Sequence, residues 1–270
     1  MVEQGLVKPG KRLEAHDMTI KEYRTQLDVS GYCIFRNVLP PNLLGKLQVG
    51  VDEAIDADIR NGWSTGQYSY LALNNHDSFV ELLESSPLQR YVDDVLDDTC
   101  IIHSFSAGRG QLKEDNPISS AIHRDTPRFC RPYILSVQIL YMIDDFTLEN
   151  GATYILAGSH KTKSKPPDEK FFAKAARLIG KAGDAVIFDS LIWHAGGANI
   201  SRARRRLITC VYSRSFMKQQ IDLPRALKGK VLEKLGDRSR RLIGHNVIVP
   251  ASMDEFVLPA EKRLYKRNQG

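Results

Sequence analysis

The feature that most constrains the fold is a series of short β-type runs that begins near residue 100. The runs are rich in β-branched and aromatic residues, and Gly, Pro, Asn or Asp separates one from the next. They are CIIHSFS (100–106), SAIHRD (120–125), ILSVQILYMI (134–143), ATYILAG (152–158), GDAVIFD (183–189) and RLITCVYS (206–213). Many short strands with turn residues between them are typical of a sandwich or barrel of the jelly-roll type. One helical stretch, EKFFAKAARLI (169–179), interrupts the series.

The first hundred residues carry helical patterns instead. Thr19 and Glu22 have the spacing of a capping box, and Gly31 is suited to end the helix that they begin. A short strand is predicted in GYCIFRNVL (31–39). Further helices are predicted from Pro40-Pro41 to Gly62, from a cap at Asp77 to Leu83, and from Pro87 toward Leu96. We therefore expect a mainly β protein with flanking helices (α+β), in which helices pack outside a double-stranded β-helix (jelly-roll, cupin-like) core.

The length of 270 residues suits one large domain, and we interpret the chain as a single domain with three parts. These are a helical part over about 1–99, the jelly-roll core over about 100–214, and a C-terminal extension over 215–270. The four cysteines form no CxxC pair, which indicates reduced thiols and a cytoplasmic setting. We expect no membrane association, because no apolar run is long enough to span a bilayer.

The net charge of +6 is unevenly distributed, since arginine and lysine crowd the segment 202–241. A nucleic-acid groove or an anionic substrate could explain this excess. A solvated basic helix explains it better than nucleic-acid binding, because no aromatic residues are interleaved with the basic ones as in a single-strand platform. We therefore expect no nucleic-acid partner, and the oligomeric state stays open.

The motif His123-x-Asp125 raises the question of a metal site. Residues two apart in a strand point to the same side, so both side chains would face the mouth of the barrel. An inward carboxylate is costly to bury unless a cation or a hydrogen-bond donor compensates it. A third ligand must come from another strand, and the other histidines are the candidates. They are His16, His76, His103, His160, His194 and His245.

His194 is the preferred third ligand, because it follows the predicted strand 183–189 near the end of the barrel. His123, Asp125 and His194, called the triad below, would match the facial triad of non-haem Fe(II) oxygenases, which leaves three metal sites open. From the residues alone, a hydrogen-bonded polar pair with an unrelated histidine is an equally good interpretation.

Longer stretches resemble the phytanoyl-CoA dioxygenase family of Fe(II)/2-oxoglutarate-dependent oxygenases. HAGGANISRARRRLITCVY (194–212) is similar to the C-terminal signature of that family, in which His194 is followed by Asn199 and Arg205. ENGATYILAGSHK (149–161) resembles its turn motif, with Ala157 in place of a proline. GDAVIFDSLIWH and GYCIFRNVLPPNLL resemble its strand before the distal histidine and its N-terminal strand-to-helix entry. The similarity runs over most of residues 18–213.

The resemblance implies that the triad binds Fe(II) and that 2-oxoglutarate and O2 are cosubstrates. The distal carboxylate of 2-oxoglutarate would pair with Arg205, because a planar guanidinium holds a carboxylate with two hydrogen bonds. Alternation along the strand places Arg205 on one face with Thr209, and we expect Arg204 and Arg206 to face solvent. Many family members have a serine where this chain has Gly196, so Thr209 is the expected replacement donor to the cosubstrate.

The remaining pocket residues are predicted from strand facing and proximity. Gln138 shares one face of the strand 134–143 with Leu140, and we expect this face to turn inward, with Gln138 near cosubstrate or substrate. The predicted substrate residues are Arg128, Arg131, Tyr133, Leu140 and Trp193. Three of them follow the His-x-Asp motif and could clamp an anionic small-molecule substrate. The loop AGRGQLKEDNPI (107–118) has glycine hinges and charge, as an active-site lid would, and a plain connecting loop is equally compatible with it.

These features predict an Fe(II)/2-oxoglutarate-dependent dioxygenase that hydroxylates a C–H bond of a small metabolite and releases succinate and CO2. Asp125 favours hydroxylation, since related halogenases have a small residue at this position. Two alternatives stay open. One is a cupin-like metal-dependent isomerase or lyase without 2-oxoglutarate, which would not need Arg205. The other is a basic nucleic-acid-binding protein on a degenerate oxygenase scaffold, whose binding would fall steeply with salt.

Overall fold

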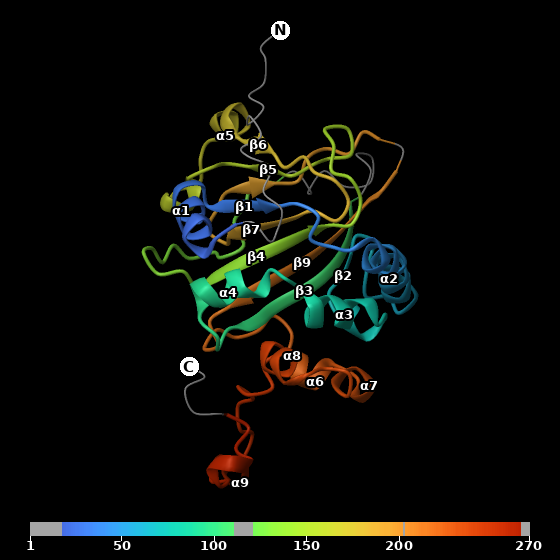
Figure 1. The fold of residues 1–270 in the computed structure, drawn as a ribbon, viewed down its shortest axis with the longest axis vertical. Coiled ribbons are helices and arrows are strands. Elements are labelled where there is room, and N and C mark those ends of the chain that lie inside the picture. The colour runs from blue at the N-terminus through green and yellow to red at the C-terminus, as the bar shows by residue number, and fades with distance from the viewer. Residues whose placement is uncertain (1–17, 111–120, 202, 266–270) are drawn as a thin grey trace.

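A six-stranded antiparallel sheet with a smaller three-stranded sheet on one side of it forms the centre of the molecule (Figure 1). The computed structural model describes residues 18–110, 121–201 and 203–265. The large sheet has the order β1 (Tyr32–Phe35), β7 (Ala185–Asp189), β4 (Ser136–Met142), β9 (Arg205–Ser213), β3 (Ile101–Gly110) and β2 (Tyr68–Ser69). The small sheet has the order β6 (Ala176–Arg177), β5 (Tyr154–Ile155) and β8 (His194–Ala195). This arrangement is the jelly-roll core that the sequence predicts.

Alternation along the strands divides the apolar side chains between the two faces of the large sheet. Ile139 on β4 and Ile208 on β9 belong to the core cluster that includes the helices. Leu140 and Leu207, each one residue away, belong to a second cluster with Phe188 and with residues of the small sheet. We call the face that carries the second cluster the inner face of the large sheet.

Four helices from the N-terminal part cover the other face of the large sheet and its edges (Figure 1). They are α1 (Ile20–Ser30), α2 (Pro41–Arg60), α3 (Ser78–Ser85) and α4 (Gln89–Leu96). The strands β1 and β2 come from the same part of the chain and complete the two edges of the large sheet. The N-terminal part and the jelly roll therefore share one sheet and one core.

The helix ends follow the sequence signals in one case and depart from them in another. At α1, the Thr19 hydroxyl accepts from the Glu22 N–H at 3.2 Å, and the Glu22 carboxylate accepts from the Thr19 N–H at 2.9 Å, which confirms the capping box. Gly31 ends this helix with φ of +82°. At α3, Asp77 is the N-cap residue as predicted, but its side chain makes no capping bond and instead pairs with Lys234 at 2.6 Å.

Two predicted elements differ from the structure. The range 169–179 is not one helix, because α5 (Asp168–Lys174) ends early and residues 176–177 form β6. The described part of 120–125 forms no strand, and His123 makes only an isolated β-bridge. Of the loop expected over 107–118, residues 107–110 belong to β3, while 111–118 lie outside the described residues.

The C-terminal extension begins with three short helices that complete the core. These are α6 (Leu223–Ala226), α7 (Gly229–Leu232) and α8 (Asp237–Leu242), followed by α9 (Met253–Phe256), which lies away from the sheets (Figure 1). Leu223, Val231 and Leu242 are at most 3% exposed and join the main core cluster. The 3-10 helices are η1 (Ala72–Asn74), η3 (Ser159–Lys161) and η4 (Ala260–Lys262). In the described ranges, no helix combines the length and the apolar character needed to cross a bilayer.

Candidate functional site

Three potential metal ligands, His123, Asp125 and His194, converge beside β8. A β-bridge joins His123 to His194, and each backbone N–H donates to the carbonyl of the other residue at 2.9 Å. From Asp125 Oδ1, the Nε2 atom of His194 lies at 3.7 Å and that of His123 at 3.9 Å. One ligand atom from each of the three residues lies within 4.8 Å of the others. These atoms are close enough to surround a single ion.

The imidazole rings are oriented by their own backbone. Nδ1 of His123 lies 3.0 Å from the carbonyl oxygen of Ala121, and Nδ1 of His194 lies 3.1 Å from that of Ile192. A ring that donates its Nδ1 proton to a carbonyl presents the Nε2 lone pair, which is the usual arrangement of metal-bound histidine. Asp125 Oδ2 is buried without a hydrogen-bond partner among the described residues. A carboxylate with one oxygen close to both Nε2 atoms and the other buried without a partner among the described residues fits a cation.

Burial keeps His194 in the form that a metal needs. The residue is 6% exposed, and this burial lowers the pKa of its imidazole below the ordinary value, while the Asp125 charge opposes the shift. A neutral imidazole is the ligand form, since protonation occupies the lone pair. His123 is more exposed, so the group is open to solvent on its side.

Arg205, the first residue of β9, is a buried cation on the inner face. It is 6% exposed, its Nη1 donates to the carbonyl oxygen of Gly151 at 2.6 Å, and its guanidinium stacks 3.9 Å above the Phe146 ring. Its Nε has no partner, and none of the described carboxylates lies within ion-pair distance. Burial lowers the pKa of Arg205 to about 10. A buried guanidinium without a counter-ion is suited to bind an anion.

The polar residues expected to line the pocket share this face. The register pairs Leu140 with Thr209 and Gln138 with Val211, so Gln138, Leu140 and Thr209 project on the same side as Arg205. The Thr209 hydroxyl lies 2.7 Å from that of Ser106 on β3. Gln138 is 7% exposed, and no hydrogen bond of its side chain occurs within the described ranges. Its amide is therefore available to a bound molecule.

The expected substrate residues near the His-x-Asp motif have partners within the protein. Arg131 makes a short ion pair with Asp189, a buried residue at the end of β7. The Tyr133 ring stacks with Arg214 at 4.8 Å, and Arg128 lies exposed at the surface. The Arg131 guanidinium is thus already neutralised by a buried carboxylate and is poorly suited to clamp an anion, whereas the role of Tyr133 stays a prediction.

Trp193 also differs from its expected role. It precedes His194 at the start of β8, so its side chain points to the opposite side and packs with Ile122 and Phe171. The Arg124 guanidinium covers the Trp193 ring at 5.0 Å. The indole thus lies in a small outer cluster rather than beside the ligands.

Two further residues lie near the site: His103, which the sequence analysis names only as one candidate for the third ligand, and Tyr68, which it does not single out. A β-bulge interrupts the pairing of β3 with β9 at His103, whose Nδ1 is buried without a partner in the described chain. Tyr68 on β2 lies over the inner face opposite Gly108. For Tyr68, the sequence signal was the pair of glycines at 108 and 110 on one strand face, because the missing side chains leave room for a neighbouring ring.

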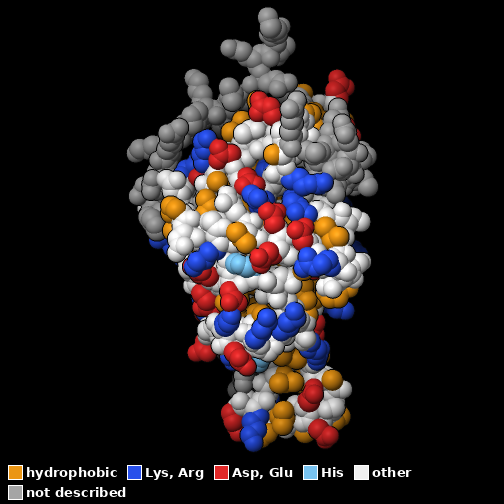
Figure 2. Space-filling view, turned by 90° about the vertical axis from the view of Figure 1, so that its right-hand side faces the viewer, with side chains coloured by type: hydrophobic (Ala, Val, Ile, Leu, Met, Phe, Trp, Pro, Cys, Tyr) orange, Lys and Arg blue, Asp and Glu red, His pale blue; other side chains and the backbone are white. Residues whose placement is uncertain are grey.

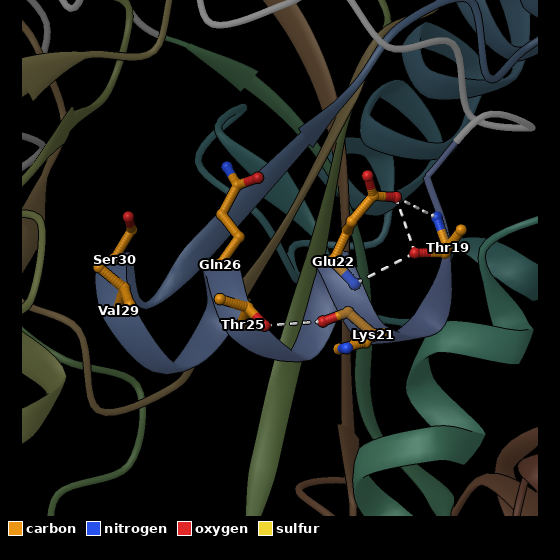
Figure 3. Close-up of a pocket in the computed structure, with 7 residues that line it drawn as sticks. All are labelled: Thr19, Lys21, Glu22, Thr25, Gln26, Val29 and Ser30. Atoms are coloured by element: carbon orange, nitrogen blue, oxygen red, sulfur yellow. Dashed lines mark hydrogen bonds between the residues drawn. The ribbon is translucent and has the colours of Figure 1, made fainter.

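A separate groove lies on the outside of α1 but holds no comparable chemistry. It has a volume of about 670 Å3 and is lined by residues of α1 and its cap (Figure 3). Figure 3 shows that several of its polar groups bond within the helix and its cap: Thr19 with Glu22, and the Thr25 hydroxyl with the Lys21 carbonyl oxygen at 2.9 Å. The triad and Arg205 therefore stay the candidate site.

The basic C-terminal segment makes many contacts within the protein. Arg206 pairs with Asp52 and Asp144, so the expectation that it faces solvent is wrong. Arg214 pairs with Asp97 and also donates to backbone carbonyls of α4. On the face shown in Figure 2, basic and acidic side chains are interspersed rather than gathered in a continuous basic strip. Much of the positive charge thus contributes to the fold.

The sequence matches the family model described as phytanoyl-CoA dioxygenase (PhyH) over residues 27–207. The uncharacterized protein Rv1501 of Mycobacterium tuberculosis is 36% identical over 196 residues, covering 71% of this chain and 72% of the relative. The iron/alpha-ketoglutarate-dependent dioxygenase penM of Penicillium thymicola is 26% identical over 241 residues, covering 79% of this chain and 74% of the relative.

Solved structures agree on the fold. The non-haem alpha-ketoglutarate-dependent carbocyclase SnoK from nogalamycin biosynthesis superposes with a TM-score of 0.60 at 16% identity, covering 82% of this chain and 98% of that one. The epimerase SnoN in complex with Fe3+, alpha-ketoglutarate and nogalamycin RO gives a TM-score of 0.57 at 16% identity, covering 72% and 83%.

Proposed function

Because this chain belongs to the phytanoyl-CoA dioxygenase family, we propose that it is an Fe(II)/2-oxoglutarate-dependent dioxygenase that hydroxylates a C–H bond of a small-molecule metabolite. Iron is the metal, and 2-oxoglutarate and O2 are the cosubstrates. The observation that carries the proposal is the combination of two Nε2 atoms close to an Asp125 carboxylate with a buried Arg205 that has no carboxylate partner among the described residues.

The triad residues would hold the iron through His123 Nε2, His194 Nε2 and one Asp125 oxygen. The metal, when bound with 2-oxoglutarate and O2, supplies the oxidising chemistry. The two backbone carbonyls that accept from Nδ1 keep both rings in the binding tautomer. The protein would thus hold the metal through these three side chains, and the cosubstrates would complete its coordination.

Arg205 would pair with the distal carboxylate of 2-oxoglutarate and so set the depth at which the cosubstrate lies. Its bond to Gly151 O and its stacking on Phe146 hold the guanidinium in place. Thr209 and Gln138 project from the same face and would donate hydrogen bonds to the cosubstrate or the substrate. In an isomerase or lyase that uses no 2-oxoglutarate, the buried Arg205 guanidinium, which has no carboxylate partner among the described residues, would have no anion to bind.

Hydroxylation is the proposed outcome because Asp125 provides a protein carboxylate as third ligand. A metal with this ligand has no vacant protein position for a halide. Two structural neighbours are an epimerase and a carbocyclase, and these reactions are those of the neighbours. Product analysis therefore has to distinguish gain of one oxygen atom from loss of two hydrogens.

The experiment is turnover of 2-oxoglutarate to succinate by purified protein with Fe(II), O2 and a metabolite extract, followed by mass spectrometry. We expect succinate from the wild type and a loss of at least roughly a thousandfold in His194→Ala. His245→Ala is the matched control, because this histidine is exposed in the C-terminal extension. Succinate formation that persists in His194→Ala, or is absent from the wild type, would refute the proposal.

A further inference from the structure

Tyr68 lies on the inner face at a place that two glycines leave open. The strand β2 contributes only Tyr68 and Ser69 to the sheet edge and pairs Tyr68 with Gly108 of β3. A Cβ atom at Gly108 would lie 2.6 Å from Tyr68 Cε1 and 3.0 Å from Leu207 Cδ1. The phenol ring thus occupies the space over a position without a side chain and contacts the inner-face cluster. It therefore extends across β3 toward β9.

The next inner-face position of β3 is Gly110, which pairs with Arg205. A Cβ atom there would lie 3.5 Å from Arg205 Nη2 and 3.7 Å from its Nε. The guanidinium and the Tyr68 ring therefore occupy adjacent spaces above two glycines of one strand. Arg205 Nε is unpartnered, and no hydrogen bond of the Tyr68 hydroxyl occurs among the described residues.

The electrostatic setting of Tyr68 agrees with this placement. Burial raises the pKa of its phenol, the Arg205 charge opposes the rise, and the charges of Tyr70 and Asp125 add to it. The hydroxyl is thus close enough to both Arg205 and the triad to be affected by each. A raised pKa keeps the phenol protonated at neutral pH, so it is a hydrogen-bond donor without charge.

We propose that Tyr68 is a cosubstrate-binding residue whose hydroxyl donates a hydrogen bond to the distal carboxylate of 2-oxoglutarate beside the Arg205 guanidinium. The inference rests on the function proposed above. A carboxylate has room for several donors, and Arg205 cannot supply all of them because its Nη1 is already bound to Gly151 O. The Tyr68 hydroxyl fills that need from the opposite side of the two-glycine gap.

The test is the dissociation constant of 2-oxoglutarate for the Mn(II)-loaded full chain, measured by calorimetry in wild type and Tyr68→Phe. Phenylalanine keeps the ring that packs over Gly108 and removes only the hydroxyl. A hydrogen bond to a charged group predicts that the dissociation constant rises roughly ten- to a hundredfold. Tyr70→Phe is the matched control, since Tyr70 stacks on Tyr68 and is 48% exposed. It should leave the constant unchanged.

A second ligand identifies the end of the cosubstrate that the hydroxyl contacts. 2-Oxovalerate keeps the chelating 2-oxo acid and has a methyl group in place of the distal carboxylate. Its affinity should be equal in wild type and Tyr68→Phe, as should the affinity for Mn(II) alone and the melting temperature. An unchanged dissociation constant of 2-oxoglutarate in Tyr68→Phe overturns the inference. An equal loss of affinity for 2-oxoglutarate and 2-oxovalerate also overturns it.

The Gly108→Ala variant tests the same arrangement from the other side. Its added methyl group would displace the Tyr68 ring from the gap, so the affinity for 2-oxoglutarate should fall while the affinity for Mn(II) stays unchanged. Wild-type protein that binds Mn(II) but no 2-oxoglutarate would refute the proposed function and this inference together. If the wild type binds 2-oxoglutarate and Tyr68→Phe binds it with the same affinity, only the inference about Tyr68 is refuted.

Discussion

Replacing Arg205 with methionine should separate cosubstrate binding from folding stability. Burial lowers the pKa of the guanidinium from 12.5 to about 10, which corresponds to roughly 3 kcal/mol against the charged form at neutral pH. Methionine removes this penalty and loses the bond to Gly151 O and the stacking on Phe146, each worth roughly 1 kcal/mol. The unfolding free energy of the ligand-free variant should therefore rise by roughly 1 kcal/mol, although most buried substitutions lower it.

The same substitution should abolish the response to 2-oxoglutarate. Removing one partner of a buried charge pair costs roughly 2–5 kcal/mol of binding, so the dissociation constant should rise by a factor of about 30 to several thousand. The assay is urea denaturation of Mn(II)-loaded protein with and without 2-oxoglutarate. At a hundred times its wild-type dissociation constant, the ligand should stabilise the wild type by roughly 2.7 kcal/mol and the variant by less than about 1 kcal/mol.

Two results would refute this reasoning. Equal stabilisation of wild type and Arg205→Met by 2-oxoglutarate would mean that the guanidinium does not bind it. A loss of more than about 2 kcal/mol in the ligand-free variant would mean that Arg205 is mainly structural. Arg205→Lys is the control, because it keeps the charge without the planar fork and should give an intermediate affinity.

Three further predictions concern stability and the outer cluster. Burial lowers the pKa of His160 to about 4, so the unfolded chain binds a proton near pH 6.5 that the folded chain accepts only near pH 4. As the pH falls through this window, the wild type should lose roughly 2–3 kcal/mol more of its unfolding free energy than His160→Gln, measured by denaturant titration at each pH. An equal pH dependence of the unfolding free energy in the two proteins would contradict this. Gly31→Ala should lower the unfolding free energy by roughly 2–4 kcal/mol, because φ is +82° and the new Cβ would lie 2.5 Å from the His160 ring; a smaller loss would show that this turn relaxes. Trp193→Phe should cost roughly 1–2 kcal/mol of stability and change kcat/KM less than about twofold, whereas a large loss of kcat/KM would return Trp193 to the substrate pocket.

The parts of the site that the sequence predicts well depend on local periodicity. The facing of Arg205 with Thr209 follows from alternation along β9, a strand of nine residues, and the structure has both on the inner face. The capping box at α1 is likewise a local signal, and its bonds form as expected. The identification of the triad drew on motif similarity, since spacing alone left six histidines as candidates for the third ligand.

The parts that the sequence missed depend on partners far along the chain. The outward direction of Trp193 could not be predicted, because β8 has only two residues and so shows no alternating pattern. Arg131 is occupied by Asp189, which lies 58 positions away. Tyr68 reaches the inner face because Gly108 pairs with it across the sheet edge, and no local pattern in a two-residue strand indicates that pairing.

The proposed activity depends on one metal position, which anomalous diffraction at the iron edge can locate in crystals grown with Fe(II) and 2-oxoglutarate without oxygen. We expect a single strong peak bounded by His123 Nε2, Asp125 and His194 Nε2, with the distal carboxylate of 2-oxoglutarate against Arg205. No peak between these three side chains, a peak at His103 instead, or a carboxylate turned away from Arg205 would contradict the account.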